Sequence, residues 1–274
     1  MKVFKALTIA GSDSGGGAGI QADLKTFQEL GVFGMSAITA VTVQNTLGVK
    51  QVYPLPPQAV VEQMEVLHED MGVDALKTGM LFSAELIRLV AAKIRELGWT
   101  RLVVDPVMVA KGGAKLLQDD AVHALREELI PLAAIVTPNL PEAEVLCGMS
   151  IRTREEQRKA AEMIVGMGAR TVVVKGGHFE DEQSVDVFYD GERFLELAGR
   201  RVMTKHTHGT GCTFSAAATA AMATGVTEEE AVRTAKAFIQ AALETPLDIG
   251  ARGHGPTNHW AYQLEVGRDA AAKK

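Results

Sequence analysis

Short apolar runs rich in β-branched residues alternate along the chain with stretches in which apolar residues recur at helical spacing. The first run, Val3–Ala10, predicts a buried strand that ends at the glycine-rich segment 11–17. Apolar residues then recur with helical spacing from Ile20 to Leu30, which predicts a helix, and Gly31 marks its end. A strand followed by an amphipathic helix is the repeating unit of α/β proteins.

The same alternation continues through most of the chain. Further strands are predicted at Met35–Val43, Val49–Tyr53, Asp74–Lys77, Arg101–Val104, Ala133–Thr137 and Thr171–Lys175. Helices are predicted near Gln58–Met71, Ile87–Leu97, Asp119–Leu129 and Glu155–Gly166, and two more open near Gly211 and Glu228. The segments Ser184–Tyr189 and Arg193–Leu197 flank a short turn and predict a β-hairpin. The pattern predicts an α/β fold of three layers, with a mostly parallel central sheet, helices on both faces and a small hairpin.

Nothing in the sequence divides the chain into separate parts. It has 274 residues and no linker, repeat or low-complexity segment. We therefore expect a single domain over residues 1–265 and a frayed tail over residues 266–274.

Composition narrows the class of protein. Apolar residues make up 47% of the chain and charged residues 23%, as in a globular protein, and the net charge of -6 is spread along the chain. This argues against nucleic acid or a membrane surface as the main partner, because both favour clustered positive charge. The two cysteines form no disulfide framework, and no apolar run reaches the roughly 18 residues of a membrane span. We expect a cytoplasmic protein.

The glycine-rich segment 11–17 is the first candidate for chemistry, because ligands bind at the carboxyl ends of strands in open α/β sheets. It matches neither the dinucleotide-binding fingerprint nor a P-loop. It is either a tight turn between strand and helix or a place where the backbone approaches a ligand closely. Glycines cost conformational entropy, which favours the second interpretation.

In the segment His208–Thr213, glycines lead directly into an alanine-rich helix. The free N–H groups at Gly209, Thr210 and Gly211 would bind an anion such as a phosphoryl group. A thiol in this first turn should have a lowered pKa, so Cys212 is either a proton acceptor or a small buried side chain. Residues alone leave these two possibilities equal.

Asn139 and Glu142 have the spacing of a helix capping box. Glu142 could equally organise the water shell of Mg²⁺ beside ATP phosphates, and both roles can hold together. The histidine pairs at 206 and 208 and at 254 and 259 lack the further ligands of a zinc site. Their imidazoles could instead donate to phosphates.

Several motifs together resemble a known family. They are, in chain order, AGSDSGGGAGIQAD (10–23), KTGM (77–80), DPVM (105–108), TPNLPEA (137–143), KGGH (175–178), HGTGC (208–212) and GHGPTNH (253–259). These segments are similar to hydroxymethylpyrimidine/phosphomethylpyrimidine kinases, which have the ribokinase-like fold. The likeness covers nearly all of residues 5–262.

The resemblance implies two successive phosphorylations with Mg-ATP in thiamine biosynthesis. The substrate would be 4-amino-5-hydroxymethyl-2-methylpyrimidine, then its monophosphate, and relatives suggest a homodimer. By position, the pyrimidine would be surrounded by Gly11, Asp23, Gln44, Met80 and Val107. A carboxamide at position 44 suits a ring nitrogen beside an exocyclic amine, because it both donates and accepts.

The resemblance also assigns the phosphate side of the site. Lys175 and the turn from Gly209 to Cys212 would contact ATP phosphates, and Glu142 with Asp105 would hold Mg²⁺ through water. Cys212 stands where most ribokinase-like sugar kinases have a catalytic Asp, so it would assist deprotonation of the hydroxyl.

Lys111, on a flap at residues 111–113, and His208 would contact the phosphate in the second step. Pyridoxine or pyridoxal kinase is the alternative activity, because its substrate is also a flat heterocycle with a hydroxymethyl group. A binding protein that has lost catalysis is a third possibility, which the intact phosphate machinery disfavours.

Overall fold

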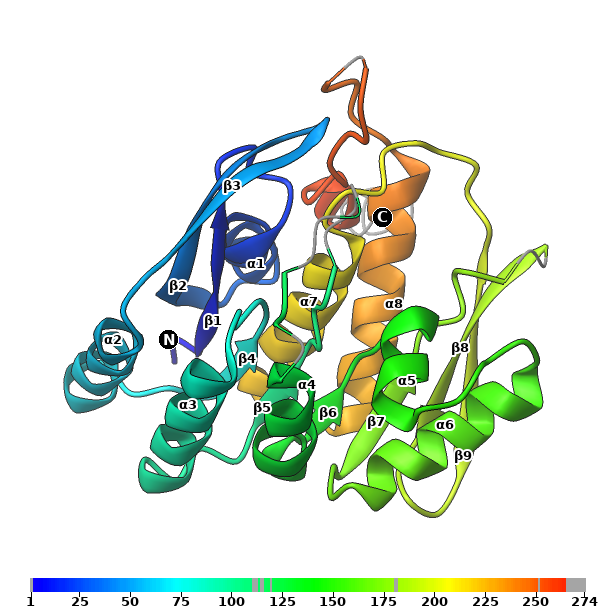
Figure 1. The fold of residues 1–274 in the computed structure, drawn as a ribbon. Helices are drawn as coiled ribbons and strands as arrows, with labels where there is room; N and C mark the ends of the chain where they lie inside the picture. The colour runs from blue at the N-terminus through cyan, green and yellow to red at the C-terminus, as the bar shows by residue number, and fades with distance from the viewer. Residues whose placement is uncertain are drawn as a thin grey trace.

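The computed structural model describes residues 2–109, 113, 116–118, 120–179, 182–250 and 252–264. Within these residues one sheet of nine strands has the order β3-β2-β1-β4-β5-β6-β7-β8-β9 (Figure 1). The strands are β1 (Lys5–Asp13), β2 (Phe33–Asn45), β3 (Gly48–Pro54), β4 (Ala75–Thr78), β5 (Leu102–Val104), β6 (Ile135–Val136), β7 (Thr171–Val174), β8 (Gln183–Tyr189) and β9 (Phe194–Arg200). The predicted sheet and hairpin are confirmed.

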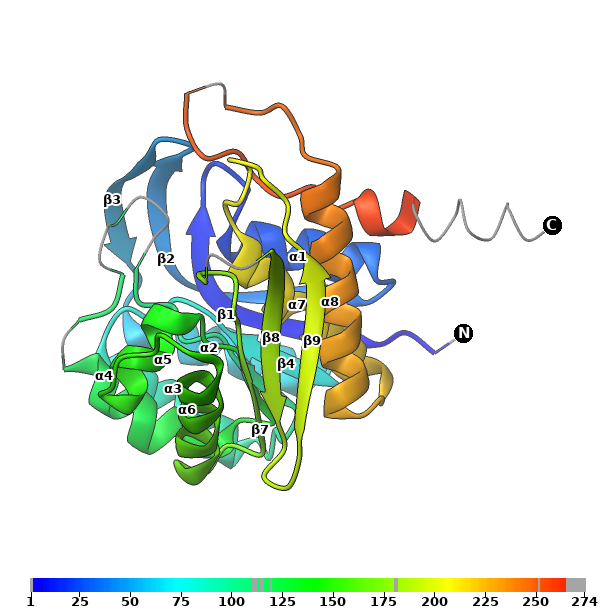
Figure 2. The ribbon, with the colours of Figure 1, turned by 90° about the vertical axis from the view of Figure 1, so that its right-hand side faces the viewer.

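Helices cover both faces of this sheet. They are α1 (Gly19–Glu29), α2 (Pro57–Asp70), α3 (Ala84–Glu96), α4 (Ala121–Ala124), α5 (Leu140–Cys147), α6 (Arg154–Gly166), α7 (Thr210–Thr224) and α8 (Glu228–Glu244). Helices α2 to α6 pack on one face, and α1, α7 and α8 pack on the other, so the sheet lies between two helical layers (Figure 2). The three-layer α/β prediction is confirmed.

The strands in the middle of the sheet are apolar at almost every position because both faces are covered. On β5, Leu102 and Val104 face the α2–α6 layer, and Val103 faces the layer of α1, α7 and α8. All three are fully buried. The sequence of such a central strand is therefore a continuous apolar run without alternation.

The strands β2, β1, β4, β5, β6 and β7 run parallel, and antiparallel pairs close the sheet at both edges. Parallel strands bring their carboxyl ends to one edge of the sheet. The segments that carry the predicted site residues follow these ends. None of the described helices is long and apolar enough to cross a membrane.

Two elements differ from their prediction. Strand β1 does not stop before Gly11 but continues to Asp13 through an irregularity between Ala10 and Ser12, since its last residues still pair with β2. The helix predicted over Asp119–Leu129 is a short α-helix, α4, followed by a π turn at Leu125–Leu129 and a 3-10 turn that contains Pro131. The predicted tail, 266–274, lies outside the described residues.

Candidate active site

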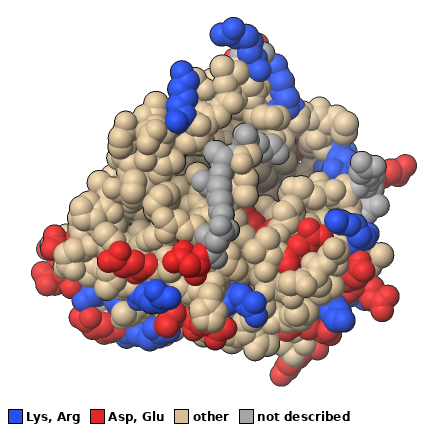
Figure 3. Space-filling model, viewed as in Figure 1, with Lys and Arg blue, Asp and Glu red and all other residues tan. Residues whose placement is uncertain are grey.

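The carboxyl ends of β1, β4, β5, β6 and β7 meet beside the start of α7 (Figure 1). The same face of the molecule is hollowed between the β2–β3 hairpin and α5 (Figure 3). Charged side chains gather mainly over the lower part of this face. The candidate site is built from the loops around the hollow.

Asp13, at the end of β1, holds the glycine-rich loop together. Its carboxylate accepts N–H bonds from Gly15 at 2.8 Å, from Gly17 at 3.1 Å and from Ala18 at 2.9 Å. His208 Nε2 lies 2.8 Å from Asp13 Oδ2. Burial alone would raise the pKa of Asp13, but the bonds from His208 and from the loop amides outweigh it and leave this pKa below its ordinary value. The loop is thus wrapped around a negative charge.

The glycine-rich loop touches the start of α7 backbone to backbone. Gly209, which precedes α7, has φ +82°, and a Cβ built on it would lie 1.7 Å from the Gly17 carbonyl oxygen. Only glycine combines this backbone conformation with so close an approach. The glycines here therefore serve contacts within the protein, between the loop and the free N–H groups of the helix start.

Beneath this start lies a buried ion pair between β4 and α1. Lys77 Nζ is 2.9 Å from Asp23 Oδ1, and both side chains are fully buried. Thr8 Oγ1 donates to the other oxygen of Asp23 at 2.6 Å. Burial by itself would lower the pKa of Lys77, but the carboxylates of Asp23 and Asp105 hold it above its ordinary value. This shift favours the charged ammonium form of Lys77.

Cys212, in the first turn of α7, lies beside this group. Part of the residue remains accessible to solvent, although protein atoms surround it closely. Burial raises the pKa of the Cys212 thiol to about 12, the positive charge of Lys77 opposes this rise, and the carboxylates of Asp23 and Asp105 add to it. The lowered pKa predicted for this thiol is wrong, because loss of solvation outweighs the positive charge of Lys77.

Asp105 follows β5 and lies between α7, which carries Cys212, and Lys175. Ser215 donates to its Oδ2 at 3.2 Å, and Thr137 donates to Oδ1 at 3.4 Å. Lys175 Nζ lies 3.6 Å from the same Oδ1. A Cβ built on Gly211 would lie 3.4 Å from Lys175 Nζ, so the lysine reaches the first turn of α7.

Glu142 completes the acidic side. Its side chain accepts from the Asn139 N–H at 2.9 Å, while Asn139 Oδ1 accepts from the Glu142 N–H at 2.9 Å. The predicted capping box is confirmed. Burial raises the pKa of Glu142 to about 7 and Asp105 adds to the rise, against the positive charge of Lys175. Glu142 can therefore change its charge near neutral pH.

An apolar wall stands next to the glycine-rich loop. Met80 and Ala40 pack together with Leu116 in a small cluster, against which Val107 is half-buried. A Cβ on Gly11 would lie 2.5 Å from Met80 Cε, so the glycine makes room for the methionine. A flat apolar ring face fits such a wall.

Gln44, near the end of β2, is held at both its backbone and its side chain. Ser14 Oγ donates to the Gln44 carbonyl at 2.7 Å and accepts from its N–H at 2.9 Å. Thr42 Oγ1 lies 3.1 Å from Gln44 Oε1, and His208 Nε2 lies 3.2 Å from Gln44 Nε2. The amide is half-buried beside the loop, in reach of a ligand.

The segment after α8 folds back over these loops. His254 N–H donates to the Thr46 carbonyl at 2.9 Å, beside the turn between β2 and β3. His208 N–H donates to the Gly255 carbonyl at 3.1 Å, and Thr257 N–H donates to the His208 carbonyl at 3.2 Å. The end of the chain thus fixes the backbone of His208.

Comparison with known proteins agrees with this architecture. The sequence profile of the family described as phosphomethylpyrimidine kinase matches residues 13–258. The chain belongs to the phosphomethylpyrimidine kinase family. It is 56% identical over 264 residues to hydroxymethylpyrimidine/phosphomethylpyrimidine kinase of Bacillus subtilis, covering 96% of this chain and 97% of that protein. It is 53% identical over 265 residues to the Haemophilus influenzae protein of the same name, covering 95% of this chain and 98% of that one.

A solved structure extends the comparison to a second activity. The ADP complex of Bacillus subtilis pyridoxal kinase superposes with a TM-score of 0.90 at 46% sequence identity, covering 96% of this chain and 100% of that one. The fold of this phosphomethylpyrimidine kinase family member is therefore shared with a kinase that acts on another heterocycle. The ribokinase-like prediction is confirmed at the level of the fold.

The structure brings most of the predicted site residues together but places some differently from expectation. Asp23 faces the interior, with both oxygens already accepting hydrogen bonds, so in this structure it lies under the site and not at its surface. Lys111 lies outside the described residues. The Cys147 side chain is half-buried against the core, and its sulfur lies 3.6 Å from the Ala160 carbonyl oxygen.

The sequence patterns predicted no role for Lys77 and Asp13, although both lie in motifs that carry the family resemblance. A lysine directly after Ala75 and Leu76 in a short predicted strand was a signal for Lys77. An acid among glycines was a signal for Asp13, because it can accept several loop amides. Neither signal identifies the partner, which lies 54 residues away for Lys77 and 195 for Asp13.

The donor set of the acidic side suits magnesium better than a directly bound transition metal. Within the described residues, no group of three His, Cys, Asp or Glu side chains converges on one point. Asp105 and Glu142 are hard oxygen donors that both influence the same lysine. Mg²⁺ commonly uses one or two carboxylates and completes its shell with water and phosphate oxygens. The residues therefore fit a hydrated ion.

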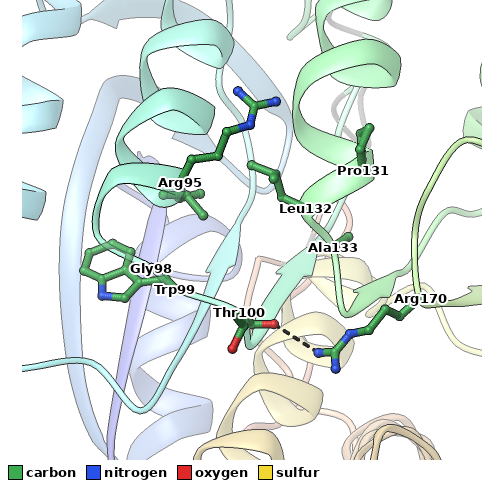
Figure 4. A pocket seen from close by; sticks show the side chains of 9 residues that line it. Arg95, Gly98, Trp99, Thr100, Pro131, Leu132, Ala133 and Arg170 are labelled. Carbon is green, nitrogen blue, oxygen red and sulfur yellow. Dashed lines mark hydrogen bonds between the residues drawn. The ribbon is translucent and has the colours of Figure 1, made fainter.

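A second hollow lies at the opposite edge of the sheet, at the amino ends of β5 and β7 (Figure 4). It has a volume of about 400 Å³ and is lined by Trp99, Arg95 and Arg170 among others. Arg95 pairs with Glu128, and Arg170 donates to the Thr100 carbonyl at 3.0 Å. Its arginines are thus already engaged, and it is far from the strand ends where the candidate site lies.

Proposed function

We propose that the chain transfers the γ-phosphoryl group of ATP to the hydroxymethyl group of 4-amino-5-hydroxymethyl-2-methylpyrimidine, and then phosphorylates the monophosphate to the diphosphate. The observation that carries this proposal is the 56% identity to the Bacillus subtilis enzyme over 96% of the chain. The reaction belongs to thiamine biosynthesis.

The start of α7 supports the phosphoryl-transfer step. Gly209, Thr210 and Gly211 present backbone N–H groups at the positive end of a helix, which would stabilise the charge that develops on the transferred group. Lys175, next to Gly211, would contact the ATP phosphates from the side. Positioning and charge stabilisation supply most of the catalysis in phosphoryl transfer.

Cys212 would take the proton of the substrate hydroxyl. Only the thiolate can accept that proton, becoming the thiol, and a pKa of about 12 makes the thiolate a minor form in the free enzyme. The ammonium of Lys77 would favour the thiolate that accepts the proton, because it lowers the pKa of this thiol. Asp23 would act from below, as the partner that holds Lys77.

The pyrimidine would lie between Gly11 and the apolar wall of Met80 and Val107, with its polar edge toward Gln44. Glu142 and Asp105 would hold Mg²⁺ through water, and the ion would supply charge neutralisation at the ATP phosphates. Lys111 would contact the phosphate of the second substrate, and Lys111→Ala should then slow the second step alone.

Pyridoxine is the second candidate substrate, because the pyridoxal kinase of Bacillus subtilis shares this fold at 46% identity. We also propose that the chain is a homodimer in the cytoplasm. Val41, Val43 and Tyr53 on the β2–β3 hairpin are 43%, 44% and 58% exposed, an apolar surface at the sheet edge. Light scattering should give twice the monomer mass, and Val43→Asp should lower it.

A coupled ATPase assay tests the activity. The purified chain is offered hydroxymethylpyrimidine, its monophosphate and pyridoxine in parallel, with and without Mg²⁺. We expect turnover of both pyrimidines, with pyridoxine slower by about tenfold or more, equivalent to about 1.4 kcal/mol in transition-state binding. Faster turnover of pyridoxine, with none on the pyrimidine monophosphate, would transfer the protein to vitamin B6 salvage.

A further inference from the structure

His208 Nε2 can act only as a donor in this structure. It lies 2.8 Å from Asp13 Oδ2, and the same oxygen accepts N–H bonds from Gly17 and Ala18. An ionised carboxylate accepts and never donates, so the hydrogen between the two residues belongs to His208. This holds for the neutral and for the charged imidazole ring.

Thr42 Oγ1 is an acceptor toward Gln44 for a similar reason. A hydroxyl group has one hydrogen, and Thr42 Oγ1 lies 2.9 Å from the carbonyl oxygen of Ser12, which can only accept. The lone pairs of Oγ1 remain for the Gln44 amide, which is 3.1 Å away. A donor and an acceptor therefore stand at opposite ends of this amide.

His208 and Thr42 together therefore determine which way round the Gln44 amide lies. With Nε2 placed 3.2 Å from His208 Nε2, two N–H donors would oppose each other. Half a turn about the last side-chain torsion exchanges oxygen and nitrogen with almost no change of shape, and hydrogen bonding decides between the two orientations. The favoured orientation directs the Gln44 nitrogen to Thr42 and the Gln44 oxygen to His208, whose single Nε2 hydrogen is then shared between Asp13 Oδ2 and this oxygen.

The directed amide retains one hydrogen and one lone pair for a ligand, since a carboxamide has two of each. A hydrogen-bond acceptor beside a donor is what an aminopyrimidine presents, through its ring nitrogen and exocyclic amine. Pyridoxine has no amine next to its ring nitrogen. A fixed amide therefore favours the aminopyrimidine, whereas a freely turning amide could adapt to either ring.

We propose that Asp13, His208 and Thr42 are positioning residues that fix the Gln44 amide and so select an aminopyrimidine over pyridoxine. The inference rests on the proposed function and adds residues that act through Gln44. The backbone contacts of His208 with Gly255 and Thr257 support it, because they hold the imidazole in one place. The bond to Asp13 also engages Nε2, one of the two ring nitrogens of His208.

A double-mutant cycle tests the inference. His208→Phe is measured with Gln44 present and in a Gln44→Ala background, and kcat/KM is determined for hydroxymethylpyrimidine and for pyridoxine. With Gln44 present, the ratio of the two values should fall about fivefold, the size of one net hydrogen bond, mostly through KM for the pyrimidine. In the Gln44→Ala background, His208→Phe should leave the ratio unchanged.

Four further variants make the comparison specific. His208→Gln, whose amide can still donate to Asp13 and to Gln44, should recover part of the selectivity. Thr42→Val removes the acceptor at the other end and should lower the same ratio, while Thr42→Ser should keep it. If His208→Phe does not fold, the two Thr42 variants test the inference in its place. His254→Phe, on the exposed segment after α8, is the control for a phenylalanine placed near the loops.

The outcomes distinguish a failure of the inference from a failure of the proposed function. Wild-type turnover of the aminopyrimidine, with equal loss of selectivity from His208→Phe in both backgrounds, would overturn the inference and leave the proposed function standing. A wild-type chain without turnover of the aminopyrimidine would overturn the proposed function and the inference with it.

Discussion

Lys77 Nζ lies 2.9 Å from Asp23 Oδ1, and neither side chain is exposed to solvent. A buried ion pair of this kind adds little net stability compared with apolar residues, because both charges lose their hydration. The pair is better explained by what stands above it. Lys77 brings a fixed positive charge to the thiol of Cys212, and Asp23 keeps that charge in the protein interior.

Removal of one partner should therefore destabilise the protein strongly. We expect Lys77→Met to lower the free energy of unfolding by about 3–5 kcal/mol, because Asp23 is left unpaired. The double variant Lys77→Met/Asp23→Asn should recover most of this stability but not the kinase rate, since the charge beside Cys212 is still missing. Urea unfolding and kcat measure the two effects. Recovery of both together would show that the pair is only structural.

The raised thiol pKa predicts low reactivity of Cys212 in the free enzyme. At pH 8 a pKa of about 12 leaves a thiolate fraction of about 10⁻⁴, and only the thiolate reacts. Iodoacetamide should label Cys212 far more slowly than free cysteine, as read by peptide mass spectrometry. Labelling as fast as free cysteine would mean that the pKa is ordinary or lowered.

Glu142 predicts a pH-dependent stability. Burial raises its folded-state pKa from 4.5 to about 7, so the folded protein binds this proton more tightly than the unfolded chain. The resulting stability is present below about pH 4.5 and is lost as the pH rises through about 7. Glu142→Gln keeps the capping box and removes the charge. In metal-free and nucleotide-free protein, its Tm should exceed that of the wild type more at pH 8 than at pH 5.

The metal-free condition matters for that comparison, because a bound cation would favour the charged carboxylate. An unchanged difference in Tm across this range would show that Glu142 does not titrate there. In the kinase assay, the same variant should be slower, which separates the stability effect from the catalytic one.

Gly209 should tolerate no side chain. A Cβ there would meet the Gly17 oxygen at 1.7 Å, and displacement of either loop would disturb the phosphate site. Gly225, after α7, is a matched control with a similarly positive φ of +97° but no neighbouring atom within 4 Å. We expect Gly225→Ala to cost about 1 kcal/mol of stability and little activity. Gly209→Ala should lose most of kcat/KM, and equal effects of the two variants would contradict the contact.

The loss of the Lys175 side chain should weaken binding of ATP and leave binding of the pyrimidine almost unchanged. Lys175→Met should raise KM for ATP by about tenfold or more, in line with the loss of a hydrogen bond to a charged group. KM for the pyrimidine should change much less. Lys159→Met on the exposed side of α6 is the control for the loss of one positive charge. An unchanged KM for ATP would place the phosphates elsewhere.

The fold could be read from the sequence because its signals are local. Apolar runs such as Thr171–Val174 are buried on both faces of the sheet, and the helices between them carry one apolar face each. The helix after β5 was harder to predict. Its apolar spacing is helical throughout, yet tertiary packing and Pro131 turn its second half into π and 3-10 turns.

The candidate site was predictable only as a set of segments. Glycine loops and helix starts are visible in sequence, whereas the partners inside the site are not. The contact between Asp13 and His208 joins residues 195 positions apart, and that between Lys77 and Asp23 spans 54. The pKa of Cys212 moved opposite to expectation for the same reason, since burial is a property of the folded chain.

The segment after α8 supports His208 and covers Thr46, although both residues belong to earlier parts of the fold. During synthesis on the ribosome, every strand of the sheet emerges before this segment does. A nascent chain can therefore build its sheet first, while the backbone contacts of His208 form only after about residue 257 has left the exit tunnel. Messages cut short after α8 would give a product without these contacts and without the buried side chains of Thr257, Asn258 and His259.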